Sequence, residues 1–125
     1  MTEAAYHVKT ASFEGPLEVL LNLIERRKLF VNEISLAAIT DDYITYVRGL
    51  PRTDIESYAA FISVAATLIL VKSRSLIPNL ELSVEEESDI TALERRLELY
   101  KLIKEIGVEI AEKFGKQIIF PRLER

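Results

Sequence analysis

The sequence predicts an all-α protein, in which a small bundle of three helices is followed by a long fourth helix. Three observations support this fold class. The chain has 125 residues, of which 49% are hydrophobic and 29% charged, a balance typical of one folded domain. Only 4 glycines and 4 prolines leave little material for the turns of an all-β fold. Finally, apolar residues recur at helical spacing in stretches bounded by helix start and stop signals.

Charge and cysteine content limit the functional classes. The formal net charge of −4 argues against a basic surface that grips nucleic acid directly. Cysteine is absent, which excludes disulfides and thiolate metal sites and favours a reducing compartment. The chain does not open with the basic and apolar leader of a signal peptide, so we expect a cytoplasmic protein.

Residues 1–12 carry a weak alternation of Tyr6, Val8 and Thr10 with other side chains, which suggests a possible short N-terminal strand. His7 is the only histidine, and no carboxylates are spaced to complete a metal site with it. We therefore expect no metal and no other cofactor.

The first helix is predicted to begin at Pro16, because a proline at the first helical position loses no hydrogen bond. Its apolar stripe consists of Leu17, Leu20, Leu21 and Ile24. Basic residues at 26–28 suit the negative end of the helix dipole, so we interpret them as a helix terminus rather than a binding patch.

The second helix is predicted to start at the N-cap Ser35 and to end at Gly49. Its apolar face consists of Leu36, Ile39, Tyr43 and Val47. Asp41 and Asp42 are adjacent, and adjacent helical positions point about 100° apart. They are therefore predicted to be solvated and not a catalytic carboxylate pair.

The third helix has two apolar stripes. A capping box of Thr53 and Glu56 is predicted to start it, and Pro78 to end it. One stripe is Ile55, Tyr58, Ala59, Ile62, Ala66 and Ile69, and the second is Phe61, Val64, Ala65, Leu68 and Val71. A surface helix normally carries one stripe, so two stripes predict burial on both sides, in the centre of a bundle or against a second protein. The uncharged run 57–71 is shorter than the ~20 residues that a membrane span needs.

An acidic linker follows Pro78 and predicts a boundary between an N-terminal helical domain, residues 1–80, and a second unit, residues 81–125. Ser83 and Glu86 form another capping box, and the fourth helix is predicted to run to about Phe114. Its stripe starts as Ile90, Leu93, Leu97 and Tyr100 and then drifts to Ile103, Ile106 and Ile110. One apolar seam on a charged helix predicts docking onto a partner rather than a place in the core. The apolar residues 118–120 are expected to be exposed.

No catalytic pattern is present in the sequence. It contains no GxxxxGK[ST] phosphate loop, no GxGxxG and no HExxH, and a single histidine near the chain end is a poor general base. These observations predict a non-enzymatic interaction protein.

Four segments carry a more specific signal: FEGPLEVLLNLI at 13–24, ITDDYI at 39–44, AATLILVKSRSLIP at 65–78 and LELYKLIKE at 97–105. In this order they resemble the bacterial segregation and condensation protein A family, the prokaryotic kleisins. The resemblance covers most of residues 13–114.

The resemblance implies a bridging subunit of a condensin-like SMC complex that acts in chromosome condensation and segregation on the nucleoid. In that family the N-terminal domain binds the coiled-coil neck of an SMC ATPase head. The middle segment binds a dimer of the winged-helix segregation and condensation protein B. DNA contact is implied only through the complex, and neither a membrane nor a small-molecule substrate is implied. The family continues into a C-terminal winged helix, so a chain ending at Arg125 is expected to be an N-terminal fragment or a short relative.

The two implied partners are assigned to two sets of residues. The expected neck interface is Phe61, Val64, Ala65, Leu68, Val71, Lys72 and Arg74, with the other stripe packed on the first two helices. The opposite assignment, with this stripe in the core and the other stripe facing the partner, stays open. The expected winged-helix interface is Leu97, Tyr100, Lys101, Ile103, Lys104 and Ile110. If the neck assignment is right, Leu68→Glu abolishes neck binding and leaves the helices intact.

A second hypothesis fits the same composition. The chain could be a self-associating helical bundle with the third helix as the core of a homodimer and without an SMC partner. Light scattering of the isolated chain distinguishes the two hypotheses.

Overall fold

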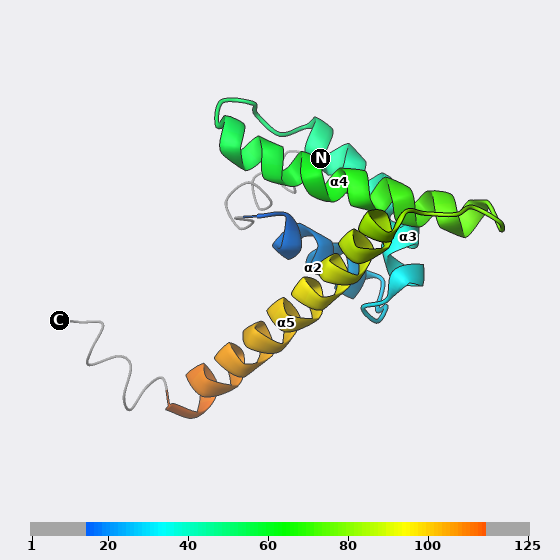
Figure 1. Ribbon diagram of the computed structural model, residues 1–125. Helices are drawn as coiled ribbons and strands as arrows, with labels where there is room; N and C mark the ends of the chain where they lie inside the picture. Colours follow the sequence, from blue (N-terminus) through cyan, green and yellow to red (C-terminus); the bar gives the residue numbers. More distant parts are fainter. Residues whose placement is uncertain (1–14, 115–125) are drawn as a thin grey trace.

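The computed structural model describes residues 15–114, and this range contains four α-helices and no strand (Figure 1). The helices are α2 Pro16–Arg26, α3 Glu33–Arg48, α4 Ile55–Leu76 and α5 Val84–Phe114. The predicted all-α fold with a long last helix is confirmed. The possible strand at residues 1–12 and the apolar residues 118–120 lie outside the described residues.

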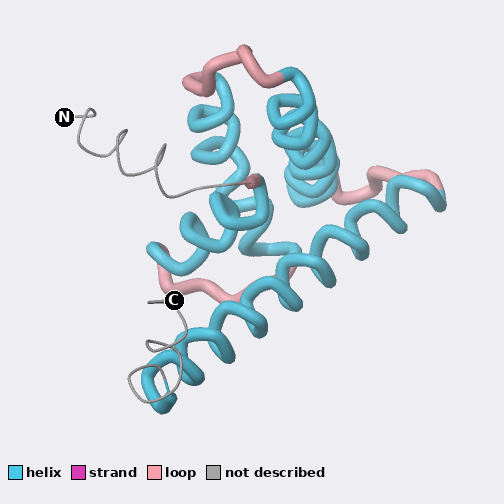
Figure 2. Tube along the Cα trace, turned by 90° about the vertical axis from the view of Figure 1, so that its left-hand side faces the viewer, coloured by secondary structure: helices cyan, strands magenta, loops and turns pink. Residues whose placement is uncertain are grey.

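The helices α3 and α4 form an antiparallel pair, which α2 and α5 complete from one side. Contacts between α3 and α4 are the most extensive of the fold, and α2 packs on α3 and α5. The first part of α5 crosses α4 and α2, whereas its C-terminal part extends beyond the bundle (Figure 2). The fold therefore consists of a compact core and one projecting helical arm.

Asx side chains cap the two central helices. The Asn32 side chain accepts a hydrogen bond from the Ser35 backbone N–H at 2.8 Å, and Asp54 accepts from that of Ser57 at 3.3 Å. The predicted N-caps Ser35 and Thr53 are therefore wrong. Asn32 and Asp54 have extended backbones from which the side chain reaches a free N–H of the first turn, and this moves each cap to the Asx residue.

The starts of the outer helices follow the sequence signals. Pro16 is the first residue of α2, as predicted. The capping box of α5 is also confirmed, because the Ser83 hydroxyl accepts from the Glu86 N–H at 3.1 Å. In return the Glu86 carboxylate accepts from the Ser83 N–H at 2.9 Å.

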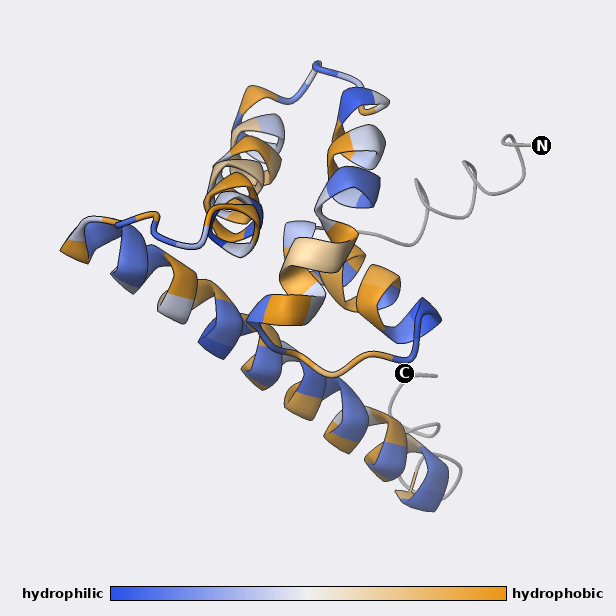
Figure 3. Ribbon diagram, turned by 90° about the vertical axis from the view of Figure 1, so that its right-hand side faces the viewer, coloured by the Kyte–Doolittle hydropathy of each residue, from blue (hydrophilic) through white to orange (hydrophobic). Residues whose placement is uncertain are grey.

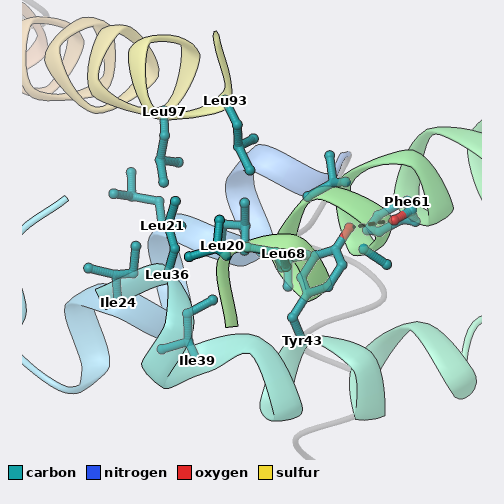
Figure 4. Packing of buried hydrophobic residues seen from close by; sticks show 14 of the residues in the cluster. Leu20, Leu21, Ile24, Leu36, Ile39, Tyr43, Phe61, Leu68, Leu93 and Leu97 are labelled. Carbon is teal, nitrogen blue, oxygen red and sulfur yellow. Dashed lines mark hydrogen bonds between the residues drawn. The ribbon is translucent and has the colours of Figure 1, made fainter. Parts of the chain in front are cut away.

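One hydrophobic core joins all four helices (Figure 4). Its buried members are Val19, Leu20, Leu21, Ile24, Leu36, Ile39, Tyr43, Val47, Phe61, Val64, Ala65, Leu68, Val71, Ile90, Leu93 and Leu97. The prediction that α5 docks on a partner and does not join the core is wrong for its first half, because Ile90, Leu93 and Leu97 are buried against α2 and α4. The functional boundary between residues 80 and 81 remains a prediction.

Buried hydrogen bonds fix the alignment of α3 against α4. The Tyr43 hydroxyl donates to the Phe61 carbonyl oxygen at 2.9 Å (Figure 4). The Thr40 hydroxyl donates to the Leu36 carbonyl at 2.7 Å and lies 3.5 Å from that of Leu68. Burial raises the pKa of the Tyr43 phenol, which therefore remains a neutral donor. A slip or rotation of α4 would leave the buried Tyr43 hydroxyl unpaired, at a cost of about 1–3 kcal/mol.

Candidate functional site

The centres of the two stripes of α4 lie roughly 130° apart around the helix axis, and the structure decides which one is free. The expected outward stripe (Phe61, Val64, Ala65, Leu68 and Val71) is buried in the core. The other stripe is exposed, with 78% of Ile55, 43% of Ile62 and 51% of Ile69 accessible. The outward orientation of the Phe61–Val71 stripe is therefore wrong, and the reverse orientation is the one observed.

Pairing with α3 explains this orientation. The two stripes are similar in hydrophobicity, so periodicity alone does not rank them. The bonds from Thr40 and Tyr43 run to backbone carbonyls on one side of α4. The Phe61 ring stacks on Tyr43 with 6.4 Å between the ring centroids. These contacts set the rotation of α4 about its axis.

The exposed face of α4 carries no charge between Glu56 and Lys72, a length of about 24 Å at 1.5 Å per residue. We call this surface the α4 face and define it by Ile55, Tyr58, Ala59, Ile62, Ala66 and Ile69. All are exposed except Tyr58, which is half-buried with the Arg52 guanidinium 5.2 Å from its ring centroid. Exposed isoleucines beside small alanines make a surface that another helix can approach closely.

The cations predicted to join the neck interface instead bind other helices of this chain. Arg74 on α4 forms a two-pronged ion pair with Glu33 of α3, at 2.8 and 2.9 Å. It also binds Glu87 of α5 at 2.6 Å. Lys72 pairs with Asp41 at 2.7 Å. Arg74 thus ties three helices together, so its role within the domain is structural.

The acidic pair of α3 takes part in two separate ion pairs. Asp41 binds Lys72 of α4, whereas Asp42 binds Arg27 at 2.6 Å. Arg27 also donates to the Ala38 carbonyl at 3.2 Å, which fastens the end of α2 to α3. Both aspartates are exposed, as predicted, and each is paired with a different cation.

Burial raises the pKa of the Glu94 carboxyl, and repulsion from Glu33 and Glu98 adds to the rise, which Arg74 partly offsets. Between the ordinary glutamate pKa of about 4.3 and this raised value, the folded state holds more protons than the unfolded state. The free energy of unfolding therefore falls as pH rises through that window. Glu94→Gln lacks this titration, so its stability relative to the parent is expected to grow through the window and then level off. Urea denaturation at pH 4–8 measures the difference, and a pH-independent difference would contradict the prediction.

The residues predicted to meet the winged-helix partner divide into covered and exposed ones. Leu97 is fully buried in the core, so its assignment as a free surface residue is wrong. Tyr100 and Lys101 are half-buried, and Lys104 lies 3.9 Å from the Glu25 carboxylate of α2. Only Ile103 and Ile110 of the predicted apolar residues are free, with 59% and 45% exposure.

The projecting part of α5 carries its own apolar stripe. We call it the α5 stripe and define it by Leu99, Ile103, Ile106, Ile110 and Phe114, which are all exposed. Figure 3 shows that hydrophobic and hydrophilic residues alternate along this part of the helix. At 100° per residue, the centre of this stripe lies roughly 140° around the helix from the buried Ile90, Leu93 and Leu97. The change of face explains the drift seen in the sequence: one half of α5 faces the core, and the other half presents a separate surface.

Sequence reasoning missed Leu99 and Phe114 as members of a surface. A signal was present, because Leu99, Ile103, Ile106 and Ile110 follow a spacing of 4, 3 and 4 residues. The predicted stripe joined the core-facing residues, which end at Leu97 and Tyr100, to the residues of the α5 stripe. It therefore treated two faces of the helix as one.

By length and composition alone, α4 is apolar enough to cross a membrane, so the shortness of its uncharged run does not settle that question. Core helices meet the same criteria, and one side of α4 is packed in the core through Phe61 and Leu68. Within residues 15–114, no group of three or more histidine or carboxylate side chains is arranged to hold a metal ion.

The fold and its surfaces define a class of protein: an all-α domain that presents two separate apolar helix faces. The family model described as Segregation and condensation protein ScpA matches residues 23–108, and the chain belongs to this family. The resemblance carried by the four sequence segments is thereby confirmed.

Individual relatives agree with the family match. Segregation and condensation protein A of Listeria innocua is 36% identical over 118 residues, which cover 90% of this chain and 47% of the relative. Its counterpart in Caldanaerobacter subterraneus is 39% identical over 106 residues, which cover 82% of this chain and 43% of the relative. The chain thus spans about half the length of the curated relatives it matches. No solved structure matches it.

Proposed function

We propose that this chain is a non-enzymatic, kleisin-type subunit of a condensin-like SMC complex that serves chromosome segregation and condensation. The observation that carries the proposal is the uncharged α4 face on a chain of the segregation and condensation protein A family. The proposed location is the cytoplasm, on the nucleoid. With a net charge of −4, contact with DNA is expected through the complex rather than through this chain.

In this proposal the α4 face binds the head-proximal coiled coil of the SMC ATPase. A coiled coil offers a groove between two helices, into which a third helix can place apolar side chains at i, i+3, i+4 and i+7. Ile55, Ile62 and Ile69 are spaced by seven residues and lie along one line of α4, so they match this mode. Their burial supplies the apolar contribution, and the absence of charge along the face avoids a desolvation cost.

The α5 stripe is proposed to bind the winged-helix segregation and condensation protein B dimer. It points away from the core-facing side of α5, so occupation of the stripe leaves the domain intact. Ile103 and Ile110 stay in this interface, whereas Leu97 leaves it. Because the α4 face and the α5 stripe belong to different helices, the two partners are expected to bind at the same time.

A double substitution tests the α4 face. Ile62→Glu with Ile69→Glu is expected to weaken capture of an SMC head with its neck by roughly 100-fold or more, since two charges would be buried without partners. Both side chains are exposed, so the far-UV circular dichroism and the urea midpoint are expected to change little. Ile34→Glu is the matched control, because Ile34 is an 82% exposed isoleucine on α3. Affinity is measured by titration calorimetry.

Unchanged capture by the double variant would contradict the α4 assignment. Light scattering of the same samples tests the self-association hypothesis. A stable dimer that the double variant dissociates, combined with no capture of the SMC neck by the parent, would favour a homodimeric scaffold in place of the SMC-binding subunit.

A further inference from the structure

The contacts of the domain divide it into a three-helix bundle, α2–α4, and one helix, α5, that is docked on this bundle. Inside the bundle, the Tyr43 hydroxyl of α3 binds the Phe61 carbonyl of α4 in the core. Ion pairs add to this bond at the surface, where Arg27 at the end of α2 and Lys72 of α4 each bind an aspartate of α3. The three helices are therefore joined to one another by polar bonds that do not involve α5.

Helix α5 is attached through a short part of its length. Of its 31 residues, the buried ones are Ile90, Leu93 and Leu97, which lie within about two turns. Leu93 and Leu97 point into the core (Figure 4). The linker 77–83 that leads into α5 consists of exposed and half-buried residues. Elements with few buried apolar contacts open at a lower free energy than global unfolding requires. These features predict that α5 opens before the bundle does.

One arginine connects α5 to the bundle across the linker. Arg74 precedes the linker and Glu87 follows it, and their ion pair of 2.6 Å holds the first turn of α5 to the end of α4. The other nitrogens of the same guanidinium bind Glu33 of α3. The Arg74 side chain is only 26% exposed, so this pair is screened less than a fully exposed one. Because Glu33 belongs to the bundle, Arg74 keeps a partner when Glu87 moves away.

A second carboxylate of α5 acts against docking. Burial raises the pKa of Glu94, and repulsion from Glu33 of α3 and from Glu98 adds to the rise, which Arg74 partly offsets. The charged form of Glu94 is therefore less favourable in the docked helix than in water. Separation of α5 would return Glu94 to water and remove it from Glu33. Glu87 and Glu94, about two turns apart on one helix, thus have opposite effects on docking.

We propose that α5 separates as a unit from an intact α2–α4 bundle, and that the Arg74–Glu87 ion pair is the latch that holds it closed. The structure shows the closed state. In the open state, Ile90, Leu93 and Leu97 are exposed to solvent, together with the side chains that they cover on α2 and α4. The open state is the minor one, because three apolar side chains must leave the core. The ion pair sets how often this apolar surface becomes accessible.

Thiol labelling measures the opening, because the chain contains no cysteine and an introduced thiol is therefore unique. Leu97→Cys on α5 and Leu36→Cys on α3 are the same substitution at two completely inaccessible positions. The thiol of the Leu97→Cys variant is expected to react with iodoacetamide at least about tenfold faster, since labelling at position 36 requires the bundle to open. Its rate is also expected to rise less steeply with urea, because less surface is exposed. Equal rates with equal urea dependence would overturn the proposal.

Amide hydrogen exchange of the unsubstituted chain checks this result without a change in the core. Backbone amides at 90–97 are expected to exchange faster than those at 36–43, because a released helix loses the packing that stabilises it. Equal protection of the two ranges would mean that α5 opens only when the whole domain unfolds, and the proposal would fail.

Two isosteric substitutions test the latch, each combined with Leu97→Cys. Glu87→Gln breaks the charge pair with Arg74 and is expected to speed labelling by roughly three- to tenfold. Glu94→Gln removes the disfavoured charge and is expected to slow labelling by roughly the same factor. Both substitutions remove one negative charge from α5, so a general charge effect would shift both rates in the same direction. Opposite shifts are the expected signature of the latch.

Glu85→Gln is the matched control for the helix dipole. Glu85 is an exposed acidic residue in the same first turn of α5 as Glu87, but Arg74 binds Glu87. Its substitution is therefore expected to change the labelling rate by less than about twofold. If Glu85→Gln speeds labelling as much as Glu87→Gln does, or if Glu87→Gln and Glu94→Gln shift the rate in the same direction, the Arg74–Glu87 pair is not the latch.

Discussion

Leu68→Ala is expected to lower the free energy of unfolding by about 2–5 kcal/mol, the range for removing a fully buried leucine side chain from a close-packed core. Leu68 is completely inaccessible and lies in the cluster that joins all four helices. Ile69→Ala is the matched control, because Ile69 is the next residue of α4 and is 51% exposed. Its expected cost is about 0.5 kcal/mol. Urea denaturation monitored by circular dichroism measures both values.

Equal costs for the two variants would mean that α4 is rotated differently from the structure. The burial of Leu68 also changes how the neck interface must be tested. A glutamate at this position would place a charge in the core and unfold the domain, so Leu68→Glu cannot report on a binding surface. Substitutions of Ile62 and Ile69 replace it for that purpose.

Arg74→Ala is expected to destabilise the domain by about 1–3 kcal/mol, because charge-assisted hydrogen bonds to carboxylates are stronger than neutral ones. Hydrogen bonds to Glu33 and Glu87 raise the pKa of the Arg74 guanidinium, which therefore stays charged. Glu33, Glu87 and Glu94 lie where α3, α4 and α5 join, and Arg74 is the cation that offsets their negative charge. Arg74→Ala removes this cation. The urea midpoint measures the loss.

The conservative and control variants sharpen this experiment. Arg74→Lys is expected to recover only part of the stability, since an ammonium cannot make the two-pronged contact with Glu33. Lys72→Ala, two residues earlier, breaks a pair whose aspartate side chain is 77% exposed. It is expected to cost at most about 0.5 kcal/mol. A cost for Lys72→Ala as large as that for Arg74→Ala would contradict a special role of Arg74.

Several features of the fold follow from local sequence signals. The proline start of α2 and the capping box of α5 depend on residues within one helical turn, and the structure confirms both. The caps of α3 and α4 were misplaced because each helix start offers two capping residue types within a few positions, and it is the side chains of Asn32 and Asp54 that accept from the first-turn N–H groups. Local chemistry limits where a cap can lie, and small differences in backbone geometry select among neighbouring candidates.

The sequence by itself determined that α4 has two apolar stripes and that the apolar stripe of α5 drifts around the helix, because both properties follow from the 3.6-residue period. Tertiary structure alone decided which stripe is buried and which part of α5 joins the core. The α4 stripes are alike in hydrophobicity, and the choice depends on how Tyr43 and Thr40 of α3 meet its backbone. Contacts between segments distant in sequence are not encoded in the periodicity of either segment. The isoleucines Ile55, Ile62 and Ile69 therefore belong to the exposed α4 face, and Leu68 belongs to the core.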